Sequence, residues 1–179
     1  QIKNDICYSN QPVVLVGISA GISYGQLGST HHSIHDFASL RTFNNISIVA
    51  PADNFEASEV IKASVGYNKP LYIRYGKKPM MSIHSSGTNF QIGKAITVSE
   101  GEDITLVSTG ETVQRAVLAG EILKTKGINP NVISMHTIKP FDNNILIKMA
   151  KKSKVLISIE EHSIYGGLGE QCANIIAQN

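Results

Sequence analysis

Three histidines lie within five positions in LGSTHHSIHD, the stretch from Leu27 to Asp36. His31 and His35 are four residues apart, a spacing that places two imidazoles on one face of a helix and suits a pair of metal ligands. No third or fourth ligand follows at a useful spacing, so the pattern argues against a metal site. An imidazole can also donate or accept a proton near pH 7, which makes proton transfer the second candidate chemistry.

The residues around the histidines indicate where a helix begins. Ser33 and Asp36 have the S-x-x-D spacing of a capping box, which predicts a helix over residues 33–42. With that start, His32 and His35 are expected to be exposed or capping neighbours.

His31 differs from the other two because it precedes this helix and follows a glycine-rich loop, residues 17–28, on the carboxyl side of an expected strand. Ligands of open α/β sheets bind at such positions. The spacing of the loop's glycines matches no phosphate-binding fingerprint. Their expected use is backbone freedom in a loop that approaches a ligand closely.

Strand and helix patterns alternate along the whole chain. Short β-branched runs predict strands at 12–18, 46–50, 70–75, 92–99, 104–110, 131–137 and 154–160. Amphipathic or capped segments predict helices at 2–9, 33–42, 54–67, 112–126, 142–151 and 169–178, with Asp53 or Asn54 capping the third. The fold class is therefore α/β, with mainly parallel sheets.

The alternation occurs twice, which predicts two units. The first covers residues 1–76, the second covers 91–179, and 77–90 reads as a linker because it is rich in Lys, Pro, Ser and Gly and has no period. The second unit has no strand after its last helix, so its sheet looks unfinished. The chain starts without methionine, and both ends are interpreted as cuts in a longer protein.

Composition excludes several classes of function. The 179 residues are 42% apolar and carry a net charge of +2, with no basic stripe interleaved with aromatics, which argues against a nucleic-acid partner. No apolar run approaches the length of a membrane span. The two cysteines, Cys7 and Cys172, are far apart and belong to no CxxC motif, which favours reduced thiols and a cytoplasmic location.

Four motifs together carry a resemblance to a known family. The segment GISAGISYGQLGSTHHSIHDFASLRTFNNISIVAPAD, residues 17–53, resembles the pyrimidine-binding domain of the transketolase family. The segments STGETVQRAVLA, HTIKPFD and EEHSIYGGLGE resemble that family's carboxy-terminal domain. The pattern is most similar to the carboxy-terminal subunit of split enzymes and to deoxyxylulose-phosphate synthase.

The resemblance implies chemistry that depends on thiamine diphosphate and magnesium and moves a two-carbon unit between sugar phosphates. It implies that His31, in the motif Thr30-His31-His32, contacts the donor near its reacting hydroxyls, and that Thr30 is a substrate neighbour. Lys77 falls near a family arginine that binds the substrate phosphate. Arg74 is a second phosphate candidate, with an outward-facing charge as the alternative.

Two departures from the family concern the donor. Leu27 stands where the family has an aspartate, and Ser19 stands where the transketolases proper have a histidine. Both family residues help to read donor hydroxyls. Their replacement predicts a different donor, either an α-keto acid or an unusual sugar.

The resemblance implies that other functional parts of the family lie outside this chain. The catalytic glutamate and the aromatics that stack on the pyrimidine are expected upstream, and the diphosphate and metal sites in another domain. The family's final strand and helix are also missing from this chain. The chain is therefore interpreted as a fragment, the latter part of one domain plus most of the next, which binds no cofactor and is inactive alone. Its expected partners are the amino-terminal diphosphate-binding domain or subunit and, in a homodimer, a second copy. Glu160, Glu161 and His162, with His136 and Lys139, are expected to be structural.

Two alternatives remain open at this point. The first alternative is the β subunit of a 2-oxoacid dehydrogenase, which would keep the cofactor and change the reaction class, although Lys77 as a phosphate contact favours the transketolase interpretation. The chain is also compatible with a dimerisation module that takes no part in catalysis.

Overall fold

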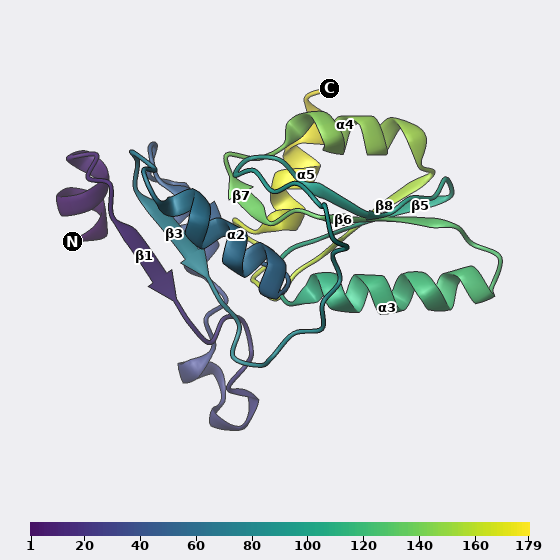
Figure 1. The fold of residues 1–179 in the computed structure, drawn as a ribbon, viewed down its shortest axis with the longest axis horizontal. Helices are drawn as coiled ribbons and strands as arrows, with labels where there is room; N and C mark the ends of the chain where they lie inside the picture. Colours follow the sequence, from purple (N-terminus) through teal and green to yellow (C-terminus); the bar gives the residue numbers. More distant parts are fainter.

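Two four-stranded sheets organise the chain, which a computed structural model describes from residue 1 to residue 179 (Figure 1). The first sheet has the order β1-β3-β2-β7 and the second the order β4-β6-β5-β8. The strands of the first are β1 (Val14–Gly17), β2 (Ser47–Val49), β3 (Leu71–Arg74) and β7 (Thr137–Lys139). Those of the second are β4 (Ile96–Ser99), β5 (Ile104–Ser108), β6 (Pro130–Ser134) and β8 (Val155–Ile159).

The helices fall between the strands as the alternation predicts. Five are α-helices: α1 (Asp36–Arg41), α2 (Asn54–Ser64), α3 (Thr112–Thr125), α4 (Asn143–Lys152) and α5 (Leu168–Ala177). A π-helix, η1 (Ile2–Tyr8), opens the chain, and two 3₁₀ turns, η2 (Gly25–Leu27) and η3 (Ser29–His31), lie in the glycine-rich loop. None of the helices is both long enough and apolar enough to span a bilayer.

The predicted α/β class with mainly parallel sheets is confirmed. β1 and β2 both run parallel to β3, and β6 and β8 both run parallel to β5. Only β7 and β4 pair antiparallel with their neighbours. Local signals placed two helix ends correctly: Asp53 Oδ1 accepts from the Glu56 amide at 3.0 Å to cap α2, and Gly127, with φ +77°, follows α3.

β7 is the element that the sequence pattern missed. Residues 131–137 read as one strand, but β6 ends at Ser134 and the chain then crosses to the other sheet, where β7 pairs with β2. The crossing is anchored by the Ala50 amide, which donates to the His136 carbonyl at 2.7 Å. A strand from the predicted second unit therefore completes the sheet of the first.

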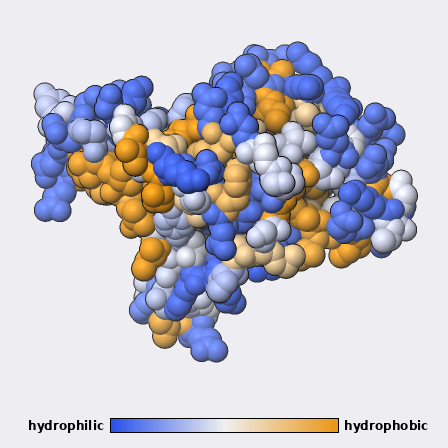
Figure 2. Space-filling model, in the orientation of Figure 1, coloured by the Kyte–Doolittle hydropathy of each residue, from blue (hydrophilic) through white to orange (hydrophobic).

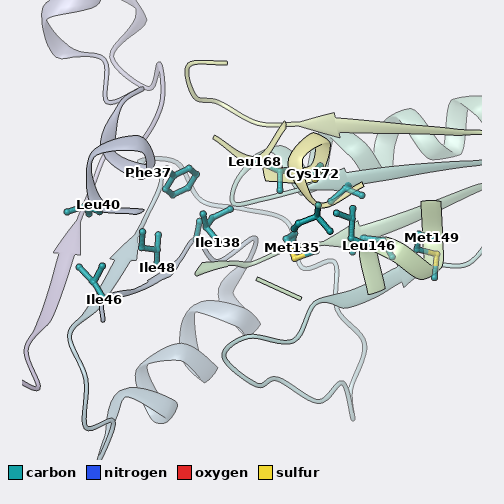
Figure 3. Packing of buried hydrophobic residues seen from close by; sticks show 14 of the residues in the cluster. Phe37, Leu40, Ile46, Ile48, Met135, Ile138, Leu146, Met149, Leu168 and Cys172 are labelled. Carbon is teal, nitrogen blue, oxygen red and sulfur yellow. The ribbon is translucent and has the colours of Figure 1, made fainter. Parts of the chain in front are cut away.

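The main core spans both units for the same reason. Its buried side chains come from strands of both sheets and from η1, α1, α4 and α5. Figure 3 shows Phe37 and Ile48 facing Ile138, while Met135 and Leu146 continue the cluster into the second unit. All five of these side chains are at most 1% exposed. Burial of this shared apolar surface holds the two sheets together.

β1 differs from expectation in its burial. A buried strand was predicted, but Val14 is 39% exposed and Val16 is 54% exposed. β1 is an edge strand that pairs only with β3, and apolar atoms gather along this side of the molecule (Figures 1 and 2). The apolar run that predicted a buried strand thus forms a sheet edge without a strand partner, and its valine side chains are exposed in this chain.

The shared core gives a direct test of β7. Replacing Ile138 with alanine removes a fully buried side chain between the sheets, so the free energy of unfolding should fall by about 2–5 kcal/mol. Ile164→Ala is the matched control, because Ile164 is 76% exposed and its loss should cost less than about 0.5 kcal/mol. Urea denaturation followed by circular dichroism measures both, and equal losses would contradict the shared core.

Candidate functional site

The loop between β1 and α1 carries the histidine cluster, and its base is closed by backbone pairing. The Gly21 amide donates to the Ser33 carbonyl at 3.0 Å, and the Ser33 amide donates back to the Gly21 carbonyl at 2.9 Å. This pairing holds Ser33 in an extended bridge. The predicted capping box is therefore wrong: α1 begins at Asp36, and His35 occupies the cap position without a side-chain cap bond.

Arg74, at the carboxyl end of β3, fastens this loop to the sheet. Its Nε donates to Asp36 Oδ2 at 2.8 Å. Its Nη2 donates to the carbonyl oxygens of Ser33 and Glu161, each at 2.9 Å. One guanidinium thus joins β3, the histidine loop and the segment after β8.

Asp36 is the acceptor at the centre of this cluster. The Tyr72 hydroxyl donates to Asp36 Oδ2 at 2.9 Å, and the guanidinium carbon of Arg74 lies 4.5 Å from the centre of the Phe37 ring. Burial and, next, the neighbouring Asp36 charge raise the pKa of the Tyr72 hydroxyl far above its ordinary value. Tyr72 therefore stays protonated and acts as a permanent donor.

This arrangement corrects the interpretation of Arg74. The outward-facing alternative is wrong, because Arg74 is only 5% exposed. Its contacts also give no support to a substrate-binding role, since the three groups that its guanidinium bonds belong to the protein. The structure shows it as the anchor of the loop.

The structure brings together the other predicted residues, Thr30, His31 and Lys77. Thr30 Oγ1 lies 3.0 Å from His31 Nδ1, and both residues are exposed. The His31 ring centre is 6.1 Å from that of Tyr24, and Lys77 Nζ lies 3.6 Å from the Tyr24 ring centre. Tyr24 therefore stands between the loop histidine and the linker lysine.

Sequence reasoning missed Tyr24, whose only signal was an aromatic ring within a glycine-rich loop. A side-chain hydrogen bond with Ser19 and, next, contact with Lys77 lower the pKa of the Tyr24 hydroxyl. Ser19 adopts φ +62°, a left-handed conformation that is uncommon for residues other than glycine.

A cleft of about 640 Å³ opens beside this group. It is lined by residues 22–27 of the loop, by Lys77 and Lys78, by Glu111 and Arg115 at the start of α3, and by Glu161 after β8. Three cations and two carboxylates from three separate segments therefore face one space. His31 is outside this lining and touches it through Tyr24.

The remaining histidines of the cluster are peripheral. His35 is exposed, as predicted, whereas His32 is half-buried and its Nε2 has no hydrogen-bond partner. No group of three or more His, Cys, Asp or Glu side chains in the chain is placed to hold a metal ion. The residues of this chain therefore do not by themselves supply the ligands of a metal-bound diphosphate cofactor.

Glu160 and His162 have the structural contacts expected of their segment, whereas Glu161, between them, lines the cleft. The Glu160 carboxylate accepts from the amides of Leu168 and Gly169, at 2.7 and 2.8 Å, and so caps the start of α5. The His162 ring stacks on Phe37 with 5.1 Å between centres.

His136 and Lys139 are also structural, as predicted. His136 is fully buried and stacks on Phe90 at 4.4 Å, and burial lowers its pKa. Lys139 Nζ donates to the Arg41 carbonyl at 2.9 Å and to that of Phe43.

Comparison with known proteins accounts for the whole arrangement. The family model described as the transketolase pyrimidine-binding domain matches residues 1–81, and the one described as the transketolase C-terminal domain matches residues 93–179. The chain belongs to the transketolase family.

Individual transketolase relatives agree with the family models. One subunit of the apulose-4-phosphate transketolase of Phocaeicola vulgatus is 40% identical over the whole chain, which covers 58% of that protein. 1-Deoxy-D-xylulose-5-phosphate synthase of Caldanaerobacter subterraneus is 34% identical over 98% of the chain, which covers 28% of it. The chain thus spans little more than half the length of the transketolase subunit that it matches.

A solved structure of the transketolase family has the same fold. It is described as a split gene transketolase, an inactive beta4 tetramer, and superposes with a TM-score of 0.91 at 30% identity. The match covers 99% of this chain and 57% of that one.

The anchoring role of Arg74 can be measured directly. Arg74→Met should lower the free energy of unfolding by about 3–5 kcal/mol, because Asp36 would keep a mostly buried charge without its partner. Lys62→Met removes the exposed Lys62–Glu59 pair and should cost about 0–1 kcal/mol. Guanidinium denaturation of both variants checks this, and a small loss for Arg74→Met would rule out the anchor.

Proposed function

We propose that the chain is the substrate-reading part of a thiamine-diphosphate-dependent, transketolase-type enzyme that transfers a two-carbon unit between sugar phosphates. One observation supports this above the rest. Tyr24 holds His31 on one side and Lys77 on the other, beside a cleft, in a chain with the transketolase fold. A proton-transfer group and a phosphate-binding charge are the two features that such a substrate requires.

The charges of the cleft suit a phosphorylated sugar. Lys77, Lys78 and Arg115 supply positive charge for the phosphate, and Arg115 offers the two-pronged geometry that lysine lacks. Glu111 and Glu161 can accept hydrogen bonds from sugar hydroxyls.

The role of His31 follows from its contact with Thr30. When the Thr30 hydroxyl donates to His31 Nδ1, the ring carries its proton on Nε2. An exposed Nε2–H can then donate to a substrate oxygen on which negative charge develops. Thr30 thus sets the tautomer while His31 contacts the substrate.

The cofactor and its magnesium ion would be held by a partner domain or subunit. Relatives named as single subunits of apulose-4-phosphate transketolases support such a partner, and we also propose that two copies of the chain associate. The departures at Leu27 and Ser19 support an unusual sugar as donor. Relatives described as acting on apulose 4-phosphate and on 6-deoxy-6-sulfo-D-fructose agree with that choice.

The test is an assay of the chain with its diphosphate-binding partner, thiamine diphosphate and magnesium. Lys77→Ala should raise KM for phosphorylated substrates by about 10- to 100-fold, because a hydrogen bond to a charged group is lost. His31→Ala should lower kcat by about 10²- to 10⁴-fold. Lys126→Ala is the control, since Lys126 lies at the far end of α3 and kinetics should not change.

The outcome also separates the alternatives. Turnover of 2-oxoacids with release of carbon dioxide, and none of ketose phosphates, would favour the 2-oxoacid dehydrogenase class. If the assembled complex were inactive on both substrate classes, the result would favour the remaining alternative, a dimerisation module that takes no part in catalysis. If Lys77→Ala and His31→Ala left the kinetics unchanged, the proposed roles of Lys77 and His31 would be wrong, even if the complex had the proposed activity.

A further inference from the structure

One histidine of the linker is buried between two carboxylates, far from the cluster that the sequence emphasises. The side chain of His84 is 2% exposed, and those of Asp53 and Glu56 are 0% exposed. His84 Nδ1 lies 2.9 Å from Asp53 Oδ2, and His84 Nε2 lies 3.1 Å from Glu56 Oε1. The second contact is an ion pair without good hydrogen-bond alignment.

This geometry favours a proton on both ring nitrogens. A neutral imidazole has one N–H and one lone pair, so whichever tautomer formed would direct a lone pair at a buried carboxylate. The neutral ring would also leave two buried negative charges without a counter-charge. The imidazolium removes both costs, because it donates to one carboxylate and pairs with the other.

The groups around His84 agree with a charged ring. Burial alone would lower the pKa of His84, but the close contacts and charges of Glu56 and Asp53 raise it, and the net pKa is above the ordinary value. Burial opposes ionisation of Asp53 too, yet backbone amides and His84 leave its pKa below the usual range.

The other titratable group that faces His84 is His136, between β6 and β7. Burial and, in part, the His84 charge lower the pKa of His136, although Glu56 and Asp142 act in the opposite direction. A neutral His136 does not compete with His84 for the two carboxylates. The Phe55 ring, 5.3 Å from that of His84, covers the remaining side of the imidazole.

The cluster connects three parts of the chain. Asp53 Oδ2 accepts from the backbone amides of Ile83 and His84, at 2.9 and 3.3 Å, which fixes the linker to the start of α2. Glu56 accepts from the Ala52 amide at 2.7 Å and from the hydroxyl of Ser134, in β6, at 2.6 Å. His84 is the cation that neutralises both carboxylates of this junction.

We propose that protonated His84 is a latch that fastens the linker to both units of the chain, and that the latch opens when the imidazole loses its proton. The latch stands independently of the proposed function. Because the folded protein binds this proton more tightly than the unfolded chain does, its stabilisation is complete below the ordinary histidine value and is lost as pH rises through the raised value. The linker should therefore loosen on the alkaline side.

The first test is the protonation state of the ring. Nitrogen-15 NMR of the histidine-labelled full chain should show His84 doubly protonated at a pH just above the ordinary histidine value of about 6.5. The signal is assigned by its absence in His84→Gln. A neutral His84 at that pH would overturn the proposal.

The second test measures linker opening by trypsin. Cleavage between Lys77 and Lys78, relative to cleavage after Lys126 in the same digest, should rise by up to about tenfold per pH unit above the His84 titration midpoint. His84→Gln should be cleaved rapidly at every pH from about 6 to about 10, and His35→Gln should keep the original profile. A cleavage ratio in the original chain that does not change with pH would overturn the latch.

Discussion

The buried ion pair of Arg74 and Asp36 is the constraint on which the functional region depends. Asp36 opens α1, Arg74 closes β3, and the guanidinium also holds backbone carbonyls of the histidine loop and of the segment after β8. An unpaired charge at either position would be costly, so the three segments are held in one arrangement. The loop that carries His31 extends from this fixed base, although η2 and η3 make few contacts with the core.

The cleft follows from this arrangement and from the linker. Its walls come from the loop, from the first turns of α3 and from the segment after β8, and the linker crosses beside them with Lys77 against Tyr24. Such a site is assembled by tertiary contacts between distant segments. The two buried charge clusters, around Asp36 and around His84, each join the first unit to the second.

The sequence predicted the fold class and most elements because strand and helix periods and end signals are local. Asp53 and Gly127 were assigned correctly on those grounds. Long-range pairing defeated the local rules elsewhere: the bridge to Gly21 keeps Ser33 out of α1, and pairing with β2 separates β7 from β6. The roles of Tyr24, Arg115 and His84 could not be predicted, since each depends on neighbours that are distant in sequence. Arg74 was chosen for its charge, and only its burial among protein acceptors shows it as an anchor.

The path of β7 has a consequence for how the chain is made. β2 stays open along one edge until residues 137–139 have been synthesised, because no earlier strand pairs with that edge. During translation the first sheet therefore lacks β7, and the edge of β2 that β7 will cover is free. Such edges recruit strands from other chains. Nascent copies on one messenger RNA are close neighbours, and the interval between residues 49 and 137 is the period in which they are most exposed to mispairing.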